Sequence, residues 1–440
     1  MNQILKLGQT VQTETTGLMC TAEEFLGGGG QGEVYRAKLG SDDVALKWYF
    51  PHWATPEQRT ILETLVEKGP PNEKFLWPME LASAPGVPGF GYVMPLREPR
   101  YKSLNDLMMR RIEPSFRALA TAGLELSHSF LQLHGKGLCY RDISFGNVFL
   151  DPDKGEILIC DNDNVTVDRE AIGGVLGTPR FMAPEVVRGD ASPSTQTDLF
   201  SLAVLLFHIF MVHHPLEGQK ELEIKCFDLP AMTKLYGLEP VFIFDPDDDS
   251  NRPVRGYHDN ALEFWPIYPQ FLHDLFTKAF TDGIRDSQNG RVRESEWRAT
   301  MVRLRDSIVY CANCGLENFY DVKVPGDSGG KPGSCWSCGR AIHLPPRIRI
   351  GKNVVMLNHD TWLFPHHVDD QKMYDFSQPV AAVTRHPKDP SIWGLKNLSD
   401  EKWVATTANG TMKDVETERS VQLAVGTRIN FGRKEGEISM

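Results

Sequence analysis

The alternation of apolar and polar positions divides the chain into a mixed first part and a strand-rich last part. Residues 20–50 alternate short apolar segments with glycine and aspartate turns, which is typical of antiparallel strands. Residues 57–68 and 115–134 carry apolar side chains at helical spacing, and residues 199–212 are almost wholly apolar, as in a helix buried in a core. The pattern therefore predicts strands in residues 20–50 and helices in the segments that follow.

After Pro345 and Pro346 the pattern changes to short strands with turns between them. Six segments are rich in β-branched and other apolar residues: 347–357, 380–384, 392–398, 403–407, 420–425 and 428–432. Short strands at this spacing predict a β-sandwich for residues 346–440.

Composition and charge narrow the functional classes. The chain has 440 residues, of which 41% are hydrophobic and 24% charged, and these are ordinary values for a globular protein with a sizeable core. The formal net charge of −11 argues against nucleic-acid binding, which needs a basic surface. Residues 1–10 lack a secretory signal, and residues 199–212 are too few to span a bilayer. We therefore expect a cytoplasmic protein with no nucleic-acid or membrane partner.

Half of the eight cysteines form two Cys-x-x-Cys pairs. Cys311 and Cys314 form the first pair, Cys335 and Cys338 form the second, and twenty residues separate the pairs. Without an export signal, disulfides are not expected, and four thiolates on two tight turns suit tetrahedral Zn²⁺. Residues 309–345 are thus predicted to form a zinc ribbon around a structural Zn²⁺, with a turn-rich loop between the pairs.

A glycine-rich turn stands between the first two predicted strands. The stretch from Gly27 to Gly32 contains five glycines and one glutamine, and Val34 follows on the next strand. A hairpin tipped with glycines lets backbone N–H groups approach phosphate oxygens that a Cβ atom would obstruct. The sequence Val-Ala-Leu-Lys follows, and it ends at Lys47, fifteen residues after the last glycine. This combination predicts a nucleotide-phosphate site.

The segment Cys139–Leu150, CYRDISFGNVFL, follows the predicted helix 115–134 and runs into a strand. Its Asp142 can accept or orient a hydroxyl proton, and its Asn147 can bind a metal ion through the amide oxygen. Alone, this spacing fits an ordinary turn equally well. A second strand, 156–160, then leads directly into the sequence Asp-Asn-Asp.

Taken in this order, the motifs resemble those of the eukaryotic-type (Hanks-type) protein kinases. The match runs from about residue 20 to 307, and its clearest part is Gly177–Glu185, GTPRFMAPE, which is similar to the family's Gly-Thr-x-x-Tyr-Met-Ala-Pro-Glu. The resemblance implies a bilobal α+β protein-kinase fold for residues 1–308, with a small lobe at about 20–96 and a large lobe at about 97–308. It also implies ATP and Mg²⁺ as cofactors.

The resemblance assigns a role to each motif residue. It implies that Asp142 is the catalytic base and that Lys47 contacts the α- and β-phosphates of ATP. Asn147 and Asp161 are the implied Mg²⁺ ligands, with Asp163 as the alternative to Asp161. The implied nucleotide-binding residues are Gly27, Gly29, Gly32, Val34, Lys47, Glu63, Met94, Leu96, Asn147 and Asp161.

Two of these assignments concern the walls of the nucleotide site. Glu63, on the predicted helix, is expected to pair with Lys47, and Glu67 one turn later is the alternative. Met94 corresponds to the gatekeeper, and the backbone near Leu96 corresponds to the segment that holds adenine.

Two further charges are expected in the helical lobe. Glu185 requires a buried cationic partner, because an unpaired buried carboxylate is costly, and Arg291 fits that role. Asp198, near the start of the apolar helix, is expected either to hold the catalytic loop or to cap the helix.

The chain departs from the kinase pattern at several positions. Ser144 stands where serine/threonine kinases have a Lys that stabilises the transferring phosphoryl group, so one source of charge stabilisation is missing. Asn162 and Asp163 replace the last two residues of Asp-Phe-Gly, and Tyr140 replaces a His. Because the base, the Lys and the metal ligands remain, we predict a protein serine/threonine kinase that phosphorylates a protein partner or itself. The alternative is a nucleotide-binding pseudokinase that acts as a signalling adaptor.

The last ninety residues resemble a forkhead-associated domain in the spacing of Trp393–Leu398, Thr407–Thr411 and Leu423–Gly432. Such domains read phosphothreonine with an Arg and a Ser, whereas here Gln378 stands in the Arg position next to Ser377. Phosphothreonine binding and a scaffold that docks a partner are both open alternatives. The whole arrangement is similar to bacterial kinases of tellurite-resistance-associated systems, which implies a von Willebrand-type protein and a metal-dependent phosphatase as partners beside the protein substrate.

Overall fold

The computed structural model describes residues 3–168, 177–322 and 333–440, which fold into two compact units. Unit 1 contains Met1–Trp265 and Phe271–Ala299, and unit 2 contains Pro266–Gln270 and Thr300–Met440. Within the described residues, no helix combines the length and the apolar character needed to cross a membrane.

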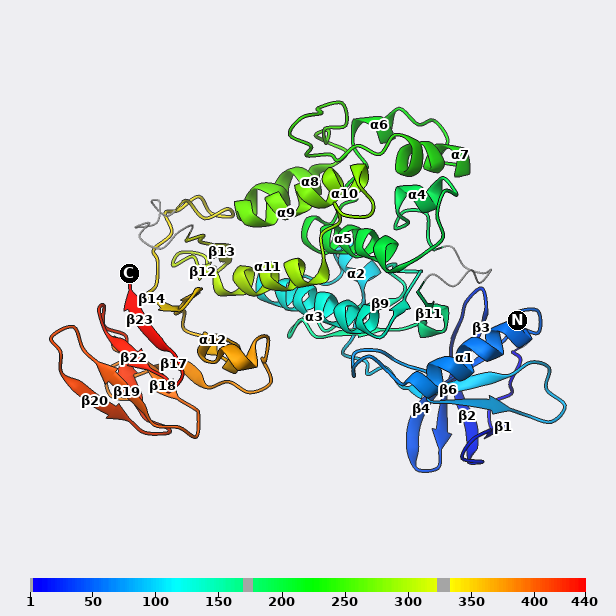
Figure 1. Cartoon of the computed structure of the whole chain (residues 1–440), viewed down its shortest axis with the longest axis horizontal. Helices are drawn as coiled ribbons and strands as arrows, with labels where there is room; N and C mark the ends of the chain where they lie inside the picture. The colour runs from blue at the N-terminus through cyan, green and yellow to red at the C-terminus, as the bar shows by residue number, and fades with distance from the viewer. Residues whose placement is uncertain (1–2, 169–176, 323–332) are drawn as a thin grey trace. The chain divides into compact units, whose positions relative to one another are not determined.

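Unit 1 begins with a closed β-barrel of strand order β1-β2-β3-β4-β6-β5 (Figure 1). The elements of this small lobe are β1 (Thr10–Thr13), β2 (Met19–Gly28), β3 (Gly32–Leu39), β4 (Asp42–Tyr49), α1 (Pro56–Lys68), β5 (Glu80–Ser83) and β6 (Gly91–Pro95). Strand β1 pairs with both β2 and β5, so the barrel includes residues before the predicted start of the lobe at residue 20. The side chains of Val11 and Thr13 point inward, which gives β1 only two buried positions and little signal in the sequence.

Helix α1 has clear start and stop signals. The Thr55 side chain accepts a hydrogen bond from the Gln58 amide, a proline stands in the first turn, and Gly69 ends the helix with φ of 65°. Leu62 and Leu65 are the fully buried residues of the helix, so the side chains around them form the inward face. This orientation decides which α1 side chains reach the predicted nucleotide site.

The chain from residue 97 to residue 306 is mainly helical, as predicted; it forms the remainder of unit 1, and three of its elements also include residues of unit 2. Its helices are α2 (Leu104–Met108), α3 (Phe116–Gly135), α4 (Pro184–Val187), α5 (Thr195–Met211), α6 (Gln219–Leu222), α7 (Leu229–Met232), α8 (Asp259–Phe264), α9 (Gln270–Phe280), α10 (Asp282–Arg285) and α11 (Glu294–Asp306), with a 3₁₀ turn η1 (Asn162–Asn164), a π-helix η2 (Thr233–Leu238) and a 3₁₀ turn η3 (Trp265–Ile267). Its short strands are β7 (Lys102–Ser103), β8 (Leu138–Cys139), β9 (Val148–Leu150), β10 (Ile157–Ile159) and β11 (Thr166–Val167). Every residue of α5 from Thr197 to Met211 is buried, so the predicted core helix is confirmed.

The predicted partner of Glu185 is also confirmed. Both oxygens of Glu185 accept hydrogen bonds of 2.8 Å from the guanidinium of Arg291, whose side chain is 2% exposed. The other Arg291 nitrogens donate to the carbonyl oxygens of Gly283 (2.7 Å) and Gln196 (2.9 Å). Arg291 therefore joins the segment after α10 to α4 and to the start of α5.

Removing this guanidinium is expected to destabilise unit 1 strongly. Arg291→Met would leave Glu185 half-buried and unpaired, and breaking such a pair costs about 3–5 kcal/mol. Urea unfolding followed by circular dichroism measures the loss. Arg285→Met is the matched control, because the Arg285 side chain is 61% exposed and its ion pair to Asp282 spans 3.9 Å. Equal stability of the two variants would contradict the structural role of Arg291.

Unit 2 contains one small two-stranded sheet and a larger β-sandwich (Figure 1). The strands and short helices are β12 (Ile308–Tyr310), β13 (Glu317–Phe319), β14 (Arg347–Ile350), β15 (Asn353–Met356), β16 (Trp362–Leu363), α12 (Pro365–Val368), η4 (Asp370–Lys372), β17 (Ala381–Arg385), β18 (Trp393–Asn397), β19 (Trp403–Thr406), β20 (Met412–Val415), β21 (Ser420–Gln422), β22 (Arg428–Asn430) and β23 (Glu435–Ser439). Sheets β15-β14-β23-β22-β19-β20 and β16-β17-β18-β21 share one apolar core, which includes Ile348, Leu395, Trp403 and Ile438. The predicted change to β-structure near the C-terminus is thus confirmed.

Candidate active site

The glycine-rich turn forms the tip of the β2–β3 hairpin. The Gly29 amide donates to the Gly32 carbonyl at 2.9 Å, and a Cβ atom on Gly27 or Gly29 would meet nothing within 4 Å. Gly32 differs, because a Cβ there would lie 2.2 Å from the carbonyl oxygen of Trp48 on β4. The tip is therefore open to a ligand, while Gly32 is required for close packing of β3 against β4.

Lys47 lies on β4 with only 5% of its surface exposed. Its Nζ atom is 2.8 Å from Oδ2 of Asp163, 3.5 Å from Oδ1 of Asp161 and 3.4 Å from Oε1 of Gln31 in the glycine turn. Burial alone would lower the pKa of Lys47, but the two carboxylates outweigh it and leave the pKa raised. The site therefore holds a charged ammonium group next to two carboxylates.

The predicted pair between Lys47 and Glu63 is wrong in this structure. The Glu63 side chain is 54% exposed and pairs with Arg59, one turn earlier on α1, at 3.0 Å. Glu67, the alternative, is also exposed. The α1 side chain that reaches the site is Gln58, whose Nε2 donates to the Asp163 carbonyl oxygen at 3.1 Å.

Asp142 and Asn147, the predicted catalytic base and a predicted metal ligand, lie together. Asn147 Nδ2 donates to the Asp142 carbonyl oxygen at 2.7 Å, and Asp142 Oδ1 accepts a hydrogen bond of 2.9 Å from Thr178 Oγ1. The Asp142 carboxylate can therefore receive a hydrogen bond from an alcohol, which is the first requirement of a base for a hydroxyl substrate.

Asp198 fixes the backbone of the segment that precedes Asp142. Its carboxylate accepts hydrogen bonds from the backbone N–H groups of Tyr140 (2.5 Å) and Arg141 (3.1 Å). The helix cap is Ser194 instead, so of the two alternatives for Asp198 only the loop-holding role is confirmed. Tyr140, which replaces the expected His, is fully buried and donates its hydroxyl to the carbonyl oxygen of Cys160.

The proposed metal ligands come from adjacent strand ends. In the antiparallel pair β9–β10, Val148 lies opposite Ile159, and the Cys160 amide donates to the Asn147 carbonyl at 2.9 Å. Asn147 precedes β9 and Asp161 follows β10, so both are at the same edge of the pair. Their oxygens are of the kind that Mg²⁺ prefers, and the Asp161 side chain is 43% exposed, so the donor set fits this ion. The Asp163 side chain has no exposed surface, which makes it the weaker alternative.

An apolar cluster adjoins these polar groups. It combines residues predicted to hold adenine with others from β4, β9 and β10: Val34, Ala45, Met94, Leu96, Phe149, Leu158 and Cys160. Apolar surfaces of this kind suit the faces of a planar base.

Three side chains of the site were missed from the sequence, namely Gln31, Tyr49 and Gln58, and each of them contacts Lys47 or its partner Asp163. Gln31 reaches Lys47 and also donates to Asn164 at 3.2 Å. The Tyr49 hydroxyl donates to Asp163, and burial together with that carboxylate raises the pKa of Tyr49 well above its ordinary value, so the phenol remains a donor. In the sequence, the only indication of this group of side chains was Asp163, the second aspartate of Asp-Asn-Asp.

His134, at the end of α3, lies between two carboxylates. Its Nε2 is 3.2 Å from Asp198 Oδ2, and its Nδ1 contacts Glu294 at the start of α11. Burial would lower the pKa of His134, but the two carboxylates raise it to about 9. A protonated His134 therefore joins α3, α5 and α11 at neutral pH.

The raised pKa of His134 makes stability dependent on alkaline pH. Because the folded pKa of about 9 exceeds the ordinary value of 6.5, the stabilisation is complete below pH 6.5 and is lost as pH rises through 9. The expected loss in unfolding free energy is about 3 kcal/mol. Urea unfolding of the wild type and of His134→Gln between pH 6.5 and about 9.5 tests this. The difference between the two proteins should shrink as pH rises, and a constant difference would contradict the assignment.

The four paired cysteines form a cluster in unit 2. Their sulfur atoms all lie within 4.8 Å of one another, with Cys311–Cys338 and Cys314–Cys335 each 3.6 Å apart. Four sulfurs bound at about 2.3 Å to a tetrahedral Zn²⁺ lie about 3.8 Å from one another, so the cluster fits this ion. The predicted loop between the pairs, residues 325–332, lies outside the described residues.

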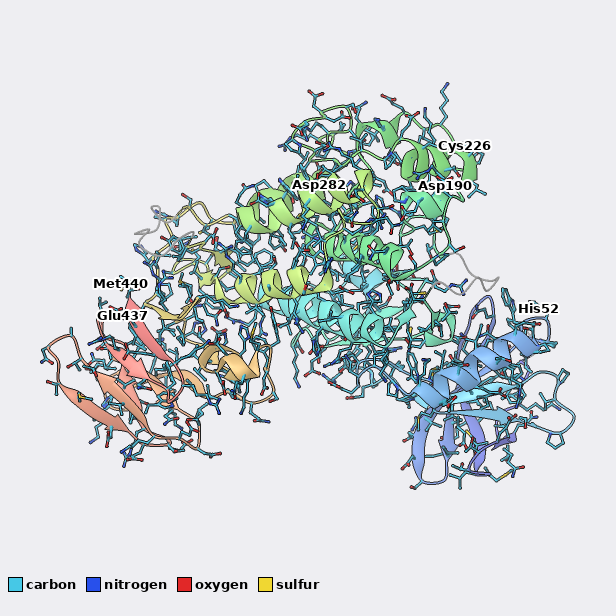
Figure 2. All side chains as sticks on the ribbon, in the orientation of Figure 1. His52, Asp190, Cys226, Asp282, Glu437 and Met440 are labelled. Carbon is cyan, nitrogen blue, oxygen red and sulfur yellow. The ribbon has the colours of Figure 1, made fainter. Side chains whose placement is uncertain are left out.

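Each Cys-x-x-Cys turn closes in the same way. The amides of Gly315 and Gly339 donate to the carbonyl oxygens of the first cysteine of their pair at 2.9 Å, and both glycines have positive φ, 77° and 68°. All eight cysteines belong to the described part of the chain and none forms a disulfide. Among the isolated ones, Cys226 is exposed in the segment between α6 and α7 (Figure 2).

Comparison with known proteins connects this geometry to a family. Residues 92–264 match the family described as the protein kinase domain. The matched residues include Asp142, Asn147 and Asp161, whereas the glycine turn and Lys47 precede them.

Curated relatives match over similar segments. The chain is 33% identical over 119 residues to a probable serine/threonine-protein kinase, CCRP1, of Zea mays, which is 26% of this chain and 19% of that protein. It is 38% identical over 96 residues to protein kinase C delta type of Rattus norvegicus, covering 21% and 14%. It is 32% identical over 114 residues to serine/threonine-protein kinase PknK of Mycobacterium bovis, covering 25% and 10%.

The matches span less than a fifth of the length of each of these relatives. They agree with the family match and with the lobes of unit 1, where a β-barrel with one helix precedes a helical lobe. Over residues 92–264, unit 1 is therefore similar to the protein kinase domain, and its β-barrel lobe followed by a helical lobe agrees with the predicted bilobal α+β arrangement.

Proposed function

We propose that this protein is an ATP- and Mg²⁺-dependent kinase that transfers the γ-phosphate of ATP to Ser or Thr hydroxyls of a protein partner or of itself. The observation that carries the proposal is the convergence of Lys47, Asp142, Asn147 and Asp161 under an open glycine hairpin. Each of these side chains has the chemistry that phosphoryl transfer requires, and the matching family and relatives are protein kinases.

In the proposed reaction the protein mainly positions groups and stabilises charge. Lys47 contacts the nucleotide phosphates, and the apolar cluster around Met94 holds the base. Asn147 and Asp161 would hold Mg²⁺, which would supply positive charge to offset that of the phosphates. Asp142 accepts the hydrogen bond of the substrate hydroxyl and takes its proton as the hydroxyl oxygen attacks phosphorus in line with the leaving oxygen.

The competing function is a pseudokinase adaptor that binds nucleotide without transfer. Ser144 favours it, because no cation at this position assists the transferring phosphoryl group. The two functions are distinguished by incubating the full-length protein with radiolabelled ATP, Mg²⁺ and casein. The proposal expects label on Ser or Thr of the chain or of casein, and EDTA should abolish it. Mg²⁺-dependent nucleotide binding without label would select the adaptor, and absence of both would reject both functions.

For unit 2 we propose a structural zinc ribbon at residues 309–345 and a forkhead-associated-like sandwich at residues 346–440 that docks a partner. Phosphothreonine recognition has less support. The Ser377 hydroxyl donates a hydrogen bond to the Asp375 carboxylate (2.6 Å). A carboxylate therefore occupies the position in which the serine of a forkhead-associated domain would contact a phosphate. Asn409 accepts a hydrogen bond of 3.1 Å from the amide of Thr411, as in an ordinary turn.

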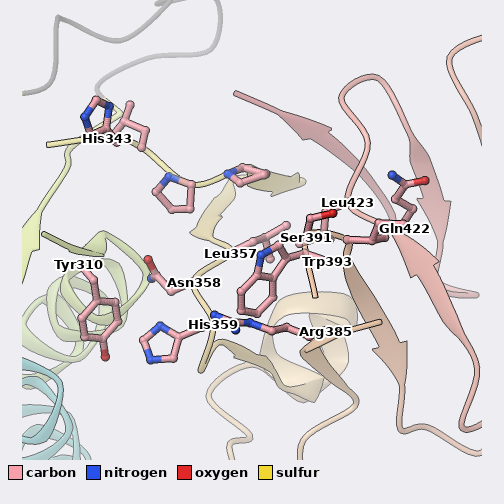
Figure 3. Close-up of a pocket in the computed structure, with 14 residues that line it drawn as sticks. Tyr310, His343, Leu357, Asn358, His359, Arg385, Ser391, Trp393, Gln422 and Leu423 are labelled. Atoms are coloured by element: carbon pink, nitrogen blue, oxygen red, sulfur yellow. The ribbon is translucent and has the colours of Figure 1, made fainter. Parts of the chain in front are cut away.

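A groove of about 660 Å³ between the zinc-ribbon segment and the sandwich supports a docking role (Figure 3). Arg385 lies 4.4 Å above the Trp393 ring and has no carboxylate partner among the described residues, and His343 and His359 line the same groove. No acidic residue lines it. We propose that an acidic segment of a partner binds here. The von Willebrand-type and phosphatase proteins implied by the sequence resemblance remain proposed partners.

A further inference from the structure

The Lys47 ammonium lacks the helix carboxylate that the kinase resemblance implies. On α1, Gln58 donates to the Tyr49 hydroxyl (3.2 Å), while Glu63 and Glu67 lie about 140° and 180° round the helix from Gln58. The inward positions near Gln58 are the buried Leu62 and Leu65. Helix α1 therefore offers an amide and two apolar side chains to the site, and no carboxylate.

Asp163 supplies the missing charge from another element. Its carboxylate is fully buried, pairs with Lys47 at 2.8 Å and accepts the Tyr49 hydroxyl. Its backbone oxygen accepts a hydrogen bond of 3.1 Å from Gln58. Strand β4 and helix α1 thus both contact this one residue of turn η1.

The turn that carries Asp163 is itself fixed. Asn162 has no exposed surface, and its Nδ2 donates to the carbonyl oxygens of Leu76 (2.9 Å) and Ile159 (3.0 Å). These bonds satisfy the amide nitrogen of a polar side chain at a position where an apolar residue was expected, while its buried Oδ1 has no hydrogen-bond partner among the described residues. The sequence Asp-Asn-Asp therefore forms a rigid turn with Asp161 partly exposed and Asp163 buried.

We propose that Asp163 is the positioning residue for Lys47 and takes the place of the helix glutamate, so that one turn carries both the Mg²⁺ ligand Asp161 and the carboxylate that orients the nucleotide-binding Lys. This inference rests on the proposed phosphotransfer. Asp163 Oδ1 has no hydrogen-bond partner among the described residues, so the carboxylate has a second acceptor for the ammonium. Asp163 can therefore stay paired with the Lys47 ammonium group when the lysine side chain turns away from Asp161 towards a phosphate.

The arrangement also makes nucleotide binding depend on the metal. Lys47, Asp161 and Asp163 together carry a formal charge of −1, which disfavours binding of the negatively charged triphosphate. A divalent cation bound at the site changes this formal charge to +1 and so favours binding of the triphosphate. In addition, rotation of α1 does not break the Lys47 pair, because the carboxylate is not on α1. Nucleotide binding is therefore controlled by metal binding at η1, and not by the position of helix α1.

Asp163→Asn and Glu63→Gln in the full-length protein test the inference. We expect Asp163→Asn to weaken binding of a fluorescent ATP analogue with Mg²⁺ by about 10-fold and to lower kcat by about 10–100-fold, while Glu63→Gln changes both by less than 2-fold. Circular dichroism checks that each variant is folded. Tyr49→Phe removes one hydrogen-bond donor to Asp163 and keeps the aromatic ring, and it should weaken nucleotide binding about 3-fold.

The outcomes separate this inference from the proposed function. If the wild type binds Mg²⁺ and nucleotide but transfers no phosphate, the function is wrong, and the binding comparison still tests Asp163. Loss of binding in Glu63→Gln with normal binding in Asp163→Asn would overturn the inference. Normal binding in both Asp163→Asn and Tyr49→Phe would overturn it too.

Discussion

Asp142→Asn is expected to lower kcat for phosphotransfer by about 10²–10⁴-fold, which is the usual contribution of general acid–base catalysis. The amide has the shape of the carboxylate and can accept the 2.9 Å hydrogen bond from Thr178, but it cannot take up a proton. The KM for ATP should change little, because Lys47 and the metal ligands remain. Initial rates with radiolabelled ATP and casein measure both constants.

Asp153→Asn is the matched control for this experiment. Asp153 is exposed in the turn between β9 and β10, so the same chemical change is made in the same lobe away from the site. Its kcat should stay within a factor of two of the wild type. An Asp142→Asn protein that retains the wild-type rate would show that another group accepts the substrate proton, and Asp142 would then only hold the loop.

The elements of unit 1 that follow from local periodicity could be predicted from the sequence. The apolar spacing of α3 and the continuous apolar run of α5 determine helices whatever their neighbours are. The pair between Glu185 and Arg291 could also be predicted, since a buried carboxylate requires a cation. These predictions depend on one residue or one segment at a time.

The partner of Lys47 could not be predicted in this way. Glu63 was expected because its distance along the chain from Lys47 was suitable, but the phase of α1 turns it towards Arg59 and solvent. Which of several carboxylates meets a distant Lys depends on helix rotation and on the course of η1, and neither has a signature in a single sequence. Strand β1 escaped prediction for a related reason, since its pairing with β5 joins residues about seventy positions apart.

Removal of the proposed zinc from the four-cysteine cluster is expected to have the largest effect on stability in unit 2. Structural Zn²⁺ contributes about 10–16 kcal/mol to small metal-bound folds, which is comparable to the whole stability of a typical domain. The strands β12 and β13 are only three residues long, and the first cysteine pair lies in the turn that joins them. Without the ion we therefore expect this hairpin to open while the sandwich, with its own apolar core, stays folded.

Metal analysis should give one zinc per wild-type chain and a reduced content in Cys335→Ser. Hydrogen exchange at the amides of β12 and β13 should accelerate at least 100-fold in this variant or after treatment with a strong chelator, while exchange in β14 and β23 is unchanged. Cys226→Ser is the control, because Cys226 is exposed and distant in sequence from both pairs, and it should behave as the wild type. A wild-type protein without zinc, or equal exchange before and after chelation, would contradict the structural zinc. In that case the 3.6 Å sulfur spacings would reflect only how the two glycine-closed turns pack against each other.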